Sequence, residues 1–457
     1  MLRKTLLATI VLVAASSAAH AEVSFNAEDN KTSLTIGGYL TTLAPVVTQT
    51  GQFKKLGKDQ NWNLVVNDNL SFNKLAVSAN LSFDINFNPD EGHRYGFFTK
   101  LNTNTSALTA CGNPENSDKA ALYLENKAFG RLEAGSYNGA YDRIKIAPDA
   151  LAVGTGGING DFYNFFTSGA FLAKNVNNAL NYSDASFAFY TSVNLPASDA
   201  TRANKITYYT PNYNGFEIGL SFIPDTEHQG TIFAVTNGGI NKKGLGYTDT
   251  IEAAVRYSTT TNDVNHGISL VGNFGKAKDY QEGAGNNFKR HDLTAFEVGT
   301  SLALKGFKIA AAYGHLGNSG TIKSITDNNG NEVALTNYLT GKPKNEFYSV
   351  GTAYEYNRIG ASITYLSSSA LGLLAKDPNQ NIIKLDQDGN KNKFQSLSLG
   401  VQYKIFDNIA AFIEYTHFQY AKKSGPNAEV VSADKPADNK FSVNKGNVVL
   451  AGLKANF

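Results

Sequence analysis

Cysteine, methionine and tryptophan occur only once each in this 457-residue sequence, and charged residues make up only 18% of it. The lone Cys111 excludes a disulfide framework, and it excludes zinc or iron–sulfur sites that need several cysteine ligands. Because 42% of the residues are hydrophobic and the net charge is close to zero, intrinsic disorder is excluded as well. The sequence therefore predicts a large folded structure without cysteine crosslinks.

Long hydrophobic runs are missing after residue 21, so no candidate for a membrane-spanning helix follows it. The one apolar stretch, residues 5–15, comes after Arg3 and Lys4 and before an Ala-x-Ala sequence that ends at Ala21. This order is typical of a cleaved signal peptide. We expect residues 1–21 to be removed on export.

The charge of the chain after residue 21 is balanced, with 39 basic and 39 acidic residues, which argues against a nucleic-acid partner. No cofactor or metal is expected either. The aspartate- and glycine-containing runs at 327–331 and 386–390 lack the first ligand of an EF-hand loop and are interpreted as turns. None of the six remaining histidines forms an H-x-x-x-H or H-E-x-x-H pattern; they are His93, His228, His266, His291, His315 and His417.

What the sequence has in quantity is glycine (42), phenylalanine (28) and tyrosine (23), together with strict alternation of apolar and polar residues. Val77, Leu81 and Ile85 alternate with serine, asparagine and aspartate, as expected for a strand with one apolar face. The pattern predicts sixteen strands, at 32–41, 74–86, 93–103, 118–127, 129–137, 204–211, 214–223, 248–259, 265–274, 291–304, 306–316, 345–356, 357–368, 393–404, 407–420 and 445–457.

The connections between these strands alternate between short turns and long loops, and the longest loop is 138–203. Transmembrane barrels have this alternation, with short periplasmic turns and long outer loops, whereas soluble sandwiches do not. We therefore predict an all-β fold in which residues 22–457 form one transmembrane antiparallel barrel of about 16 strands. A hairpin within 180–193 would raise the number to 18. The outward face is expected to contact outer-membrane lipid, and the inward face, polar throughout, is expected to line a water-filled lumen.

At this point the sequence resembles the general bacterial porins. Three features carry the resemblance: the final aromatic residue Phe457, the stretch Tyr123–Gly135, and the stretch Arg202–Phe216. The resemblance implies a homotrimer of 16-stranded channels in the outer membrane, through which small hydrophilic solutes and ions pass passively. It also implies a third loop folded into the lumen, and an assembly signal at Phe457 that the barrel assembly machinery reads.

The third loop and the facing wall are the predicted site of pore constriction. The loop lacks the short acidic Pro-Glu-Phe-Gly-Gly-like motif of the family. Its charged candidates are Asp142, Arg143, Asp149 and Asp161, and the lumen-wall candidates are Lys100, Arg131, Glu133, Arg256, Lys308 and Arg358. The alternation places eight acids, among them Glu252, Glu297 and Glu414, and six bases on the inward face. We expect loop acids to face wall bases such as Lys100 and Arg131, and the pore to have weak selectivity, slightly for cations.

The predicted function is that of an outer-membrane porin for passive diffusion, and not of an enzyme. A solute-selective channel is the alternative within transport. A barrel enzyme or a surface adhesin is the alternative outside it.

Overall fold

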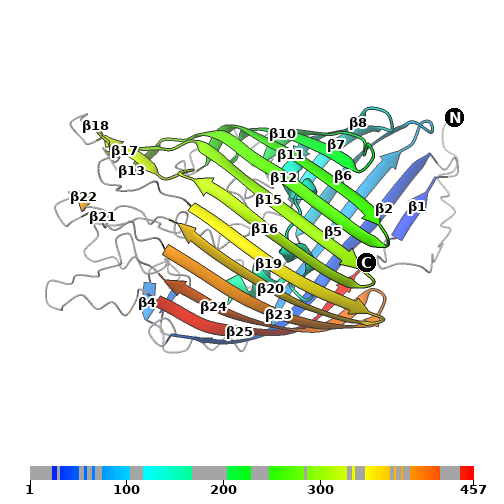
Figure 1. Cartoon of the computed structure of the whole chain (residues 1–457). Coiled ribbons are helices and arrows are strands. Elements are labelled where there is room, and N and C mark those ends of the chain that lie inside the picture. The colour runs from blue at the N-terminus through cyan, green and yellow to red at the C-terminus, as the bar shows by residue number, and fades with distance from the viewer. Residues whose placement is uncertain are drawn as a thin grey trace, which may run out of the picture.

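The computed structural model describes residues 23–27, 31–50, 56–58, 64–66, 75–102, 117–166, 203–227, 246–282, 286–326, 332–334, 345–370, 375–376, 382–383, 392–421 and 443–457. Sixteen antiparallel strands form a closed barrel in which each strand pairs with its neighbours in chain order (Figure 1). These strands are β2 (Thr32–Gln49), β5 (Ala76–Phe87), β6 (His93–Asn102), β7 (Ser117–Asn126), β8 (Gly130–Ser136), β9 (Asn204–Tyr209), β10 (Phe216–Asp225), β11 (Tyr247–Thr261), β12 (Val264–Ala277), β15 (Leu293–Leu304), β16 (Phe307–Gly317), β19 (Asn345–Tyr356), β20 (Ile359–Ala370), β23 (Asn392–Phe406), β24 (Ile409–Ala421) and β25 (Val443–Asn456).

The barrel closes where β2 pairs with β25, from Tyr39 opposite Asn456 to Gln49 opposite Gly446. A short strand, β1 (Val23–Asn26), pairs with the remaining part of β2, between Ser33 and Ile36. β1 and β25 therefore pair with the same edge of β2, one after the other. Closure leaves no free edge in the membrane, where an unpaired backbone group costs several kcal/mol.

Tight turns join the strands at one end of the barrel. Asn262 and Asp263, which connect β11 to β12, both have positive φ angles (50° and 65°), as the favoured two-residue hairpin turn requires. At the other end, strands β13 (Tyr280–Glu282), β14 (Asn286–Arg290), β17 (Ile322–Thr326) and β18 (Glu332–Ala334) form a small sheet beyond the barrel rim (Figure 1). Two further pairs are β3 (Leu56–Lys58) with β4 (Leu64–Val66) and β21 (Ala375–Lys376) with β22 (Ile382–Ile383). Among the described helices, none has the length and apolar character to cross a membrane.

The two faces of the wall differ as the alternation predicts. On β23, Leu399 and Val401 face outward and are 39% and 55% exposed, which suits contact with lipid. Ser398 faces inward but is only 2% exposed, and its hydroxyl lies 2.8 Å from that of Thr416. Inward position on this barrel therefore does not always mean contact with water.

The sixteen predicted strands are confirmed, with ends that shift by a few residues. The largest correction is β2, which continues to Gln49 instead of ending at residue 41. Pro45 is tolerated there because the pairing of β5 with β2 ends at Leu43, so among the described residues β2 has a neighbour on one side only beyond that point. The strand β1 was not predicted. The alternative hairpin at 180–193, Cys111 and the runs at 327–331 and 386–390 lie outside the described residues.

Candidate pore constriction

Residues 137–166, here called the internal segment, follow β8 and run along the inward face of the wall. The segment contains α1 (Ala140–Ile144), η3 (Pro148–Leu151), η4 (Gly157–Asn159) and η5 (Asp161–Asn164). Helix α1 contacts β9 to β12, η3 contacts β16, β19 and β20, η4 contacts β20, β23 and β24, and η5 contacts β25. The described part of the predicted third loop thus follows the inner wall over most of its circumference.

Hydrogen bonds to wall side chains hold the first half of the internal segment. The backbone N–H of Ala140 donates to the hydroxyl of Ser221, at 2.7 Å. Tyr141 donates twice to wall carboxylates, from its N–H to Glu252 (3.4 Å) and from its hydroxyl to Glu297 (2.5 Å). Both glutamates are at most 2% exposed, so their carboxylates face the segment and not the solute path.

The second half is held in the same manner, chiefly by Glu414 of β24. Its carboxylate accepts from the N–H of Thr155 (2.9 Å), from the hydroxyl of Thr155 (2.9 Å) and from the N–H of Gly157 (3.3 Å). The N–H groups of Val153 and Ile158 donate to Ser362 and Thr364 (3.0 and 3.2 Å). Because wall groups satisfy backbone donors, the path of the segment depends more on the wall than on the segment's own side chains.

Glycines at inward positions of the wall allow the internal segment to lie close to the wall. A side chain at Gly299 would overlap the carbonyl oxygen of Ile146, and a Cβ at Gly351 would lie 2.9 Å from the Cβ of Pro148. A Cβ at Gly400 would lie 2.8 Å from a methyl group of Val153. Any larger residue at these positions would push the segment toward the centre of the lumen.

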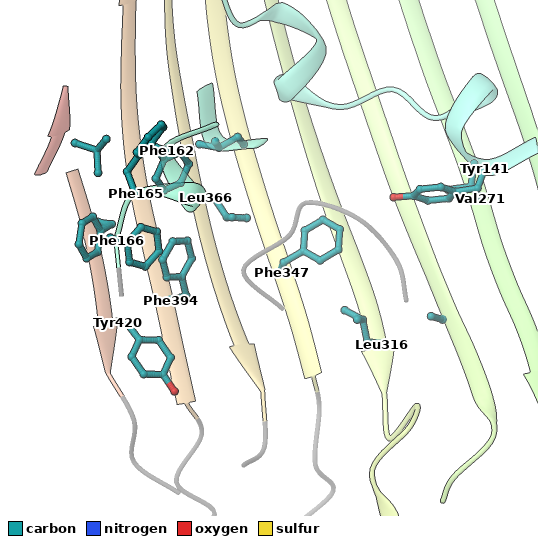
Figure 2. Close-up of a cluster of buried hydrophobic side chains, with 14 of the residues drawn as sticks. Tyr141, Phe162, Phe165, Phe166, Val271, Leu316, Phe347, Leu366, Phe394 and Tyr420 are labelled. Carbon is teal, nitrogen blue, oxygen red and sulfur yellow. The ribbon is translucent and has the colours of Figure 1, made fainter. Parts of the chain in front are cut away.

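An aromatic cluster anchors the far end of the internal segment. The Phe166 ring lies 4.1 Å from that of Phe418, and the Tyr163 ring lies 5.8 Å from that of Phe394 (centroid distances). Figure 2 shows Phe162, Phe165 and Phe166 beside Phe394 and Leu366. This packing excludes water from the part of the wall that carries Phe394 and Phe418.

The expectation of an inward face that is polar throughout is therefore wrong at the loop-bearing end of the wall. There the inward positions of β15 to β25 carry buried apolar residues: Leu293, Leu316, Phe347, Leu366, Phe394, Phe418 and Val448. Charged inward residues are concentrated nearer the turns. The alternation of apolar and polar residues could not reveal this, because an apolar inward position looks like an irregularity in the pattern.

Three arginines and three glutamates form a network where the internal segment leaves β8. Arg131 pairs with Glu133 (2.6 Å) and Glu125 (3.0 Å), and Arg256 pairs with Glu217. Arg143, from the segment, lies 3.6 Å from Glu133 and 3.8 Å from Glu217 and stacks over the Tyr209 ring at 4.1 Å. Arginine suits such a site because its planar guanidinium binds carboxylates and aromatic faces together.

The electrostatic arrangement in this network is the reverse of the one expected. The loop base Arg143 faces wall acids, whereas loop acids were expected to face Arg131. Asp149 instead lies 3.6 Å from Lys145 of the same segment and accepts from Asn159 (3.1 Å). Burial raises the pKa of Asp142 although Lys145, Lys119 and Lys205 are near, and burial raises the pKa of Asp161 although Lys454 is near.

The remaining predicted wall bases lie apart from the Arg143 network. Lys308 lies 3.8 Å from Glu355, and the Lys100 ammonium lies 5.7 Å from the centre of the Tyr39 ring. Arg358 donates to the carbonyl oxygen of Ile405, at 3.0 Å. Lys404 of β23 was not predicted, although its alternation with Tyr403 could have shown that it faces inward.

Comparison with known proteins agrees with this architecture. The family model described as "Gram-negative porin" matches residues 8–423. The chain belongs to the Gram-negative porin family. This porin is a channel of the outer membrane, through which small hydrophilic solutes pass by passive diffusion.

Relatives and solved structures are similar to this porin at low sequence identity. An uncharacterized protein of Rickettsia typhi is 22% identical over 379 residues, which cover 74% of the porin and 75% of the relative. OmpF of Salmonella typhi is 14% identical, with a TM-score of 0.52, and covers 95% of the porin and 100% of OmpF. The channel DcaP of Acinetobacter baumannii is 12% identical, with a TM-score of 0.48, over 95% and 99% of the two chains.

Proposed function

We propose that the internal segment is the constriction of this diffusion channel and sets its size limit. The observation that carries the proposal is the series of hydrogen bonds from the segment's backbone to the inward residues Ser221, Glu252, Glu414 and Ser362, on four different strands. A segment fixed at several points around the wall narrows the lumen without filling it. The channel carries out no catalysis in this proposal.

Swelling of liposomes that contain the purified protein, in sugars of graded size, tests the diffusion channel. We expect the swelling rate to fall smoothly with solute size. Saturation by a single sugar would instead support a solute-selective channel, and the absence of swelling with any sugar would contradict the proposal.

Gly299→Ala tests whether the internal segment is the constriction. The new methyl group would overlap the Ile146 carbonyl, so the segment must move, and single-channel conductance should change clearly. The matched control is Gly272→Ala on the outward face of β12, where the new Cβ would lie 3.1 Å from the Phe274 ring edge and 3.5 Å from the Ala295 carbonyl oxygen, away from the internal segment. Equal conductance of wild type and both variants would show that the segment does not form the constriction.

We also propose that the protein assembles as a homotrimer through the outward face of β24, β25, β2 and β5. This face has small residues at some positions, with Ala44 paired to Ala451 across the seam and Ala79 on β5, among exposed apolar side chains that include Leu40, Val46, Ile413 and Leu453. Where alanines pair, a second barrel can approach closely and pack against the apolar side chains around them.

Ala451→Trp should convert the trimer to monomers, because the indole would stand out from the proposed contact face. Size-exclusion chromatography with light scattering in detergent measures the mass directly. Ala361→Trp, on the outward face of β20, is the matched control and should leave the trimer intact. A trimer in both variants would rule out this contact face, and a monomeric wild type would rule out the trimer.

Export and assembly complete the proposal. Residues 1–21 are removed as a signal peptide, and the barrel assembly machinery recognises the last strand, which ends at Phe457. Lipid then surrounds the outward face outside the trimer contacts.

A further inference from the structure

Burial separates the acidic from the basic residues of the described lumen. The inward carboxylates of Glu252, Glu297 and Glu414 are at most 2% exposed and accept hydrogen bonds from the internal segment. Glu133 and Glu217 are 3% and 8% exposed and lie within the network of arginines. These five acids contribute little negative surface to the solute path.

The more accessible wall acids have cationic or hydroxyl partners. Glu125 pairs with Arg131 at 3.0 Å, and Glu355 lies 3.8 Å from Lys308. The Tyr123 hydroxyl donates to Asp84 at 3.3 Å. Pairing of this kind cancels much of the negative field that these carboxylates would otherwise project into the lumen.

Three bases on the opposite part of the wall have no such partners. They are Lys404 and Lys454, at inward positions, and Arg358, in the turn between β19 and β20; together they are here called the basic arc, and each is at least partly exposed. Within the described residues, none of the three has a carboxylate within salt-bridge distance; the acid that interacts with Lys454 is Asp161, at longer range.

The three residues of the basic arc lie close together on the wall. The N–H of Lys404 donates to the carbonyl oxygen of Arg358 at 2.8 Å, which places the two side by side. Lys404 and Lys454 are both opposite Ala410, on either side of β24. They are therefore two strands apart on the same face, about 10 Å between backbones.

We infer that this pore conducts small anions in preference to cations, and that the basic arc supplies the preference. The inference rests on the proposed diffusion channel. An arc of unpaired cations beside a low-dielectric wall concentrates anions in the adjacent water.

The sign of this preference is opposite to the one expected from counting inward acids and bases. The count treats a buried glutamate and an exposed lysine as equal contributions. The burial of Glu252, Glu297 and Glu414 beneath the internal segment removes three acids from the accessible surface. Among the described lumen residues, the accessible charges without an oppositely charged partner at salt-bridge distance are then those of the basic arc.

The zero-current potential of the intact protein in planar bilayers, under a potassium chloride gradient, tests the inference. We expect a chloride-to-potassium permeability ratio above one. In the double variant Lys404→Glu, Lys454→Glu the ratio should fall by a factor of about two or more, because two cations of the arc become anions. The matched control is Lys127→Glu, Lys305→Glu, which makes the same charge change in the turns after β7 and β15, away from the basic arc.

A measurement on the wild type needs no variant to fold. Its permeability ratio should move toward one when the salt concentration rises from 0.1 to 1 M, since the Debye length falls from about 10 to 3 Å. A ratio below one at low salt, or equal changes in the lumen and turn variants, would overturn the inference while leaving the channel in place. Bilayers without any conductance would instead overturn the proposed channel.

Discussion

Deletion of Phe457 should remove most of the protein from the outer membrane of cells. Phe457 pairs with Gly38 through both backbone groups, at 2.6 and 3.0 Å, at the end of the seam that closes the barrel. Its ring lies directly over Gly38, where a Cβ would approach the ring carbons to 3.0 Å. The deletion therefore removes two seam hydrogen bonds, together with the proposed signal for the assembly machinery. Quantification of the protein in isolated outer membranes measures the effect.

Two comparisons separate assembly from stability. Phe457→Ala retains the backbone pairing with Gly38 but loses the ring, so it should share the assembly defect. Refolded in detergent, the truncated barrel should lose much less stability than its level in cells suggests, because the remaining pairs between β2 and β25 are intact. Normal amounts of the truncated protein in the outer membrane would refute the assembly role of Phe457.

Leu399→Arg should lower the free energy of unfolding in a lipid bilayer by about 2–4 kcal/mol, the cost of an arginine facing lipid near the midplane of a barrel. Leu399 lies midway along β23 and is exposed on the outward face. Urea-induced unfolding of the protein in vesicles measures the loss.

The control for Leu399→Arg must lie on the inward face and reach water. Ser398, the adjacent residue, does not qualify, because it is buried and its hydroxyl lies within hydrogen-bond distance of that of Thr416. Gln402 on the same strand faces inward, beside Gly360, and is partly exposed, so Gln402→Arg should cost far less than Leu399→Arg. Equal losses in the two variants would show that the faces of β23 are assigned wrongly.

The strands could be predicted from the sequence because residues that face lipid are apolar, whereas their neighbours that face the lumen are mostly small or polar. In β23 the alternation of Leu397, Leu399 and Val401 with serine and glycine identifies both the strand and its outward face. The pattern failed where this contrast weakens. Beyond residue 41, β2 continues through Pro45, which normally indicates the end of a strand, and β1 has only four residues.

The candidate constriction was predictable in part. Alternation assigned Glu252, Glu297 and Glu414 to the inward face, and the length and charges of the third loop indicated where a constriction would form. Their burial was not predictable, because it depends on the path of the internal segment. That path is determined by contacts between residues far apart in the chain, such as Thr155 with Glu414 and Ile146 with Gly299.

The seam between β2 and β25 has a consequence for the folding pathway. It joins residues 39–49 to residues 446–456, so the pairing that completes the barrel unites chain regions about 400 residues apart. Such non-local pairing closes a very long loop, and topologies of this kind fold slowly. Until the last strand arrives, part of β2 presents an unpaired edge that could template aggregation. We therefore expect the chain to depend on a factor that covers this edge during transit to the membrane, and we expect that dependence to ease in a circular permutant that makes β25 and β2 consecutive.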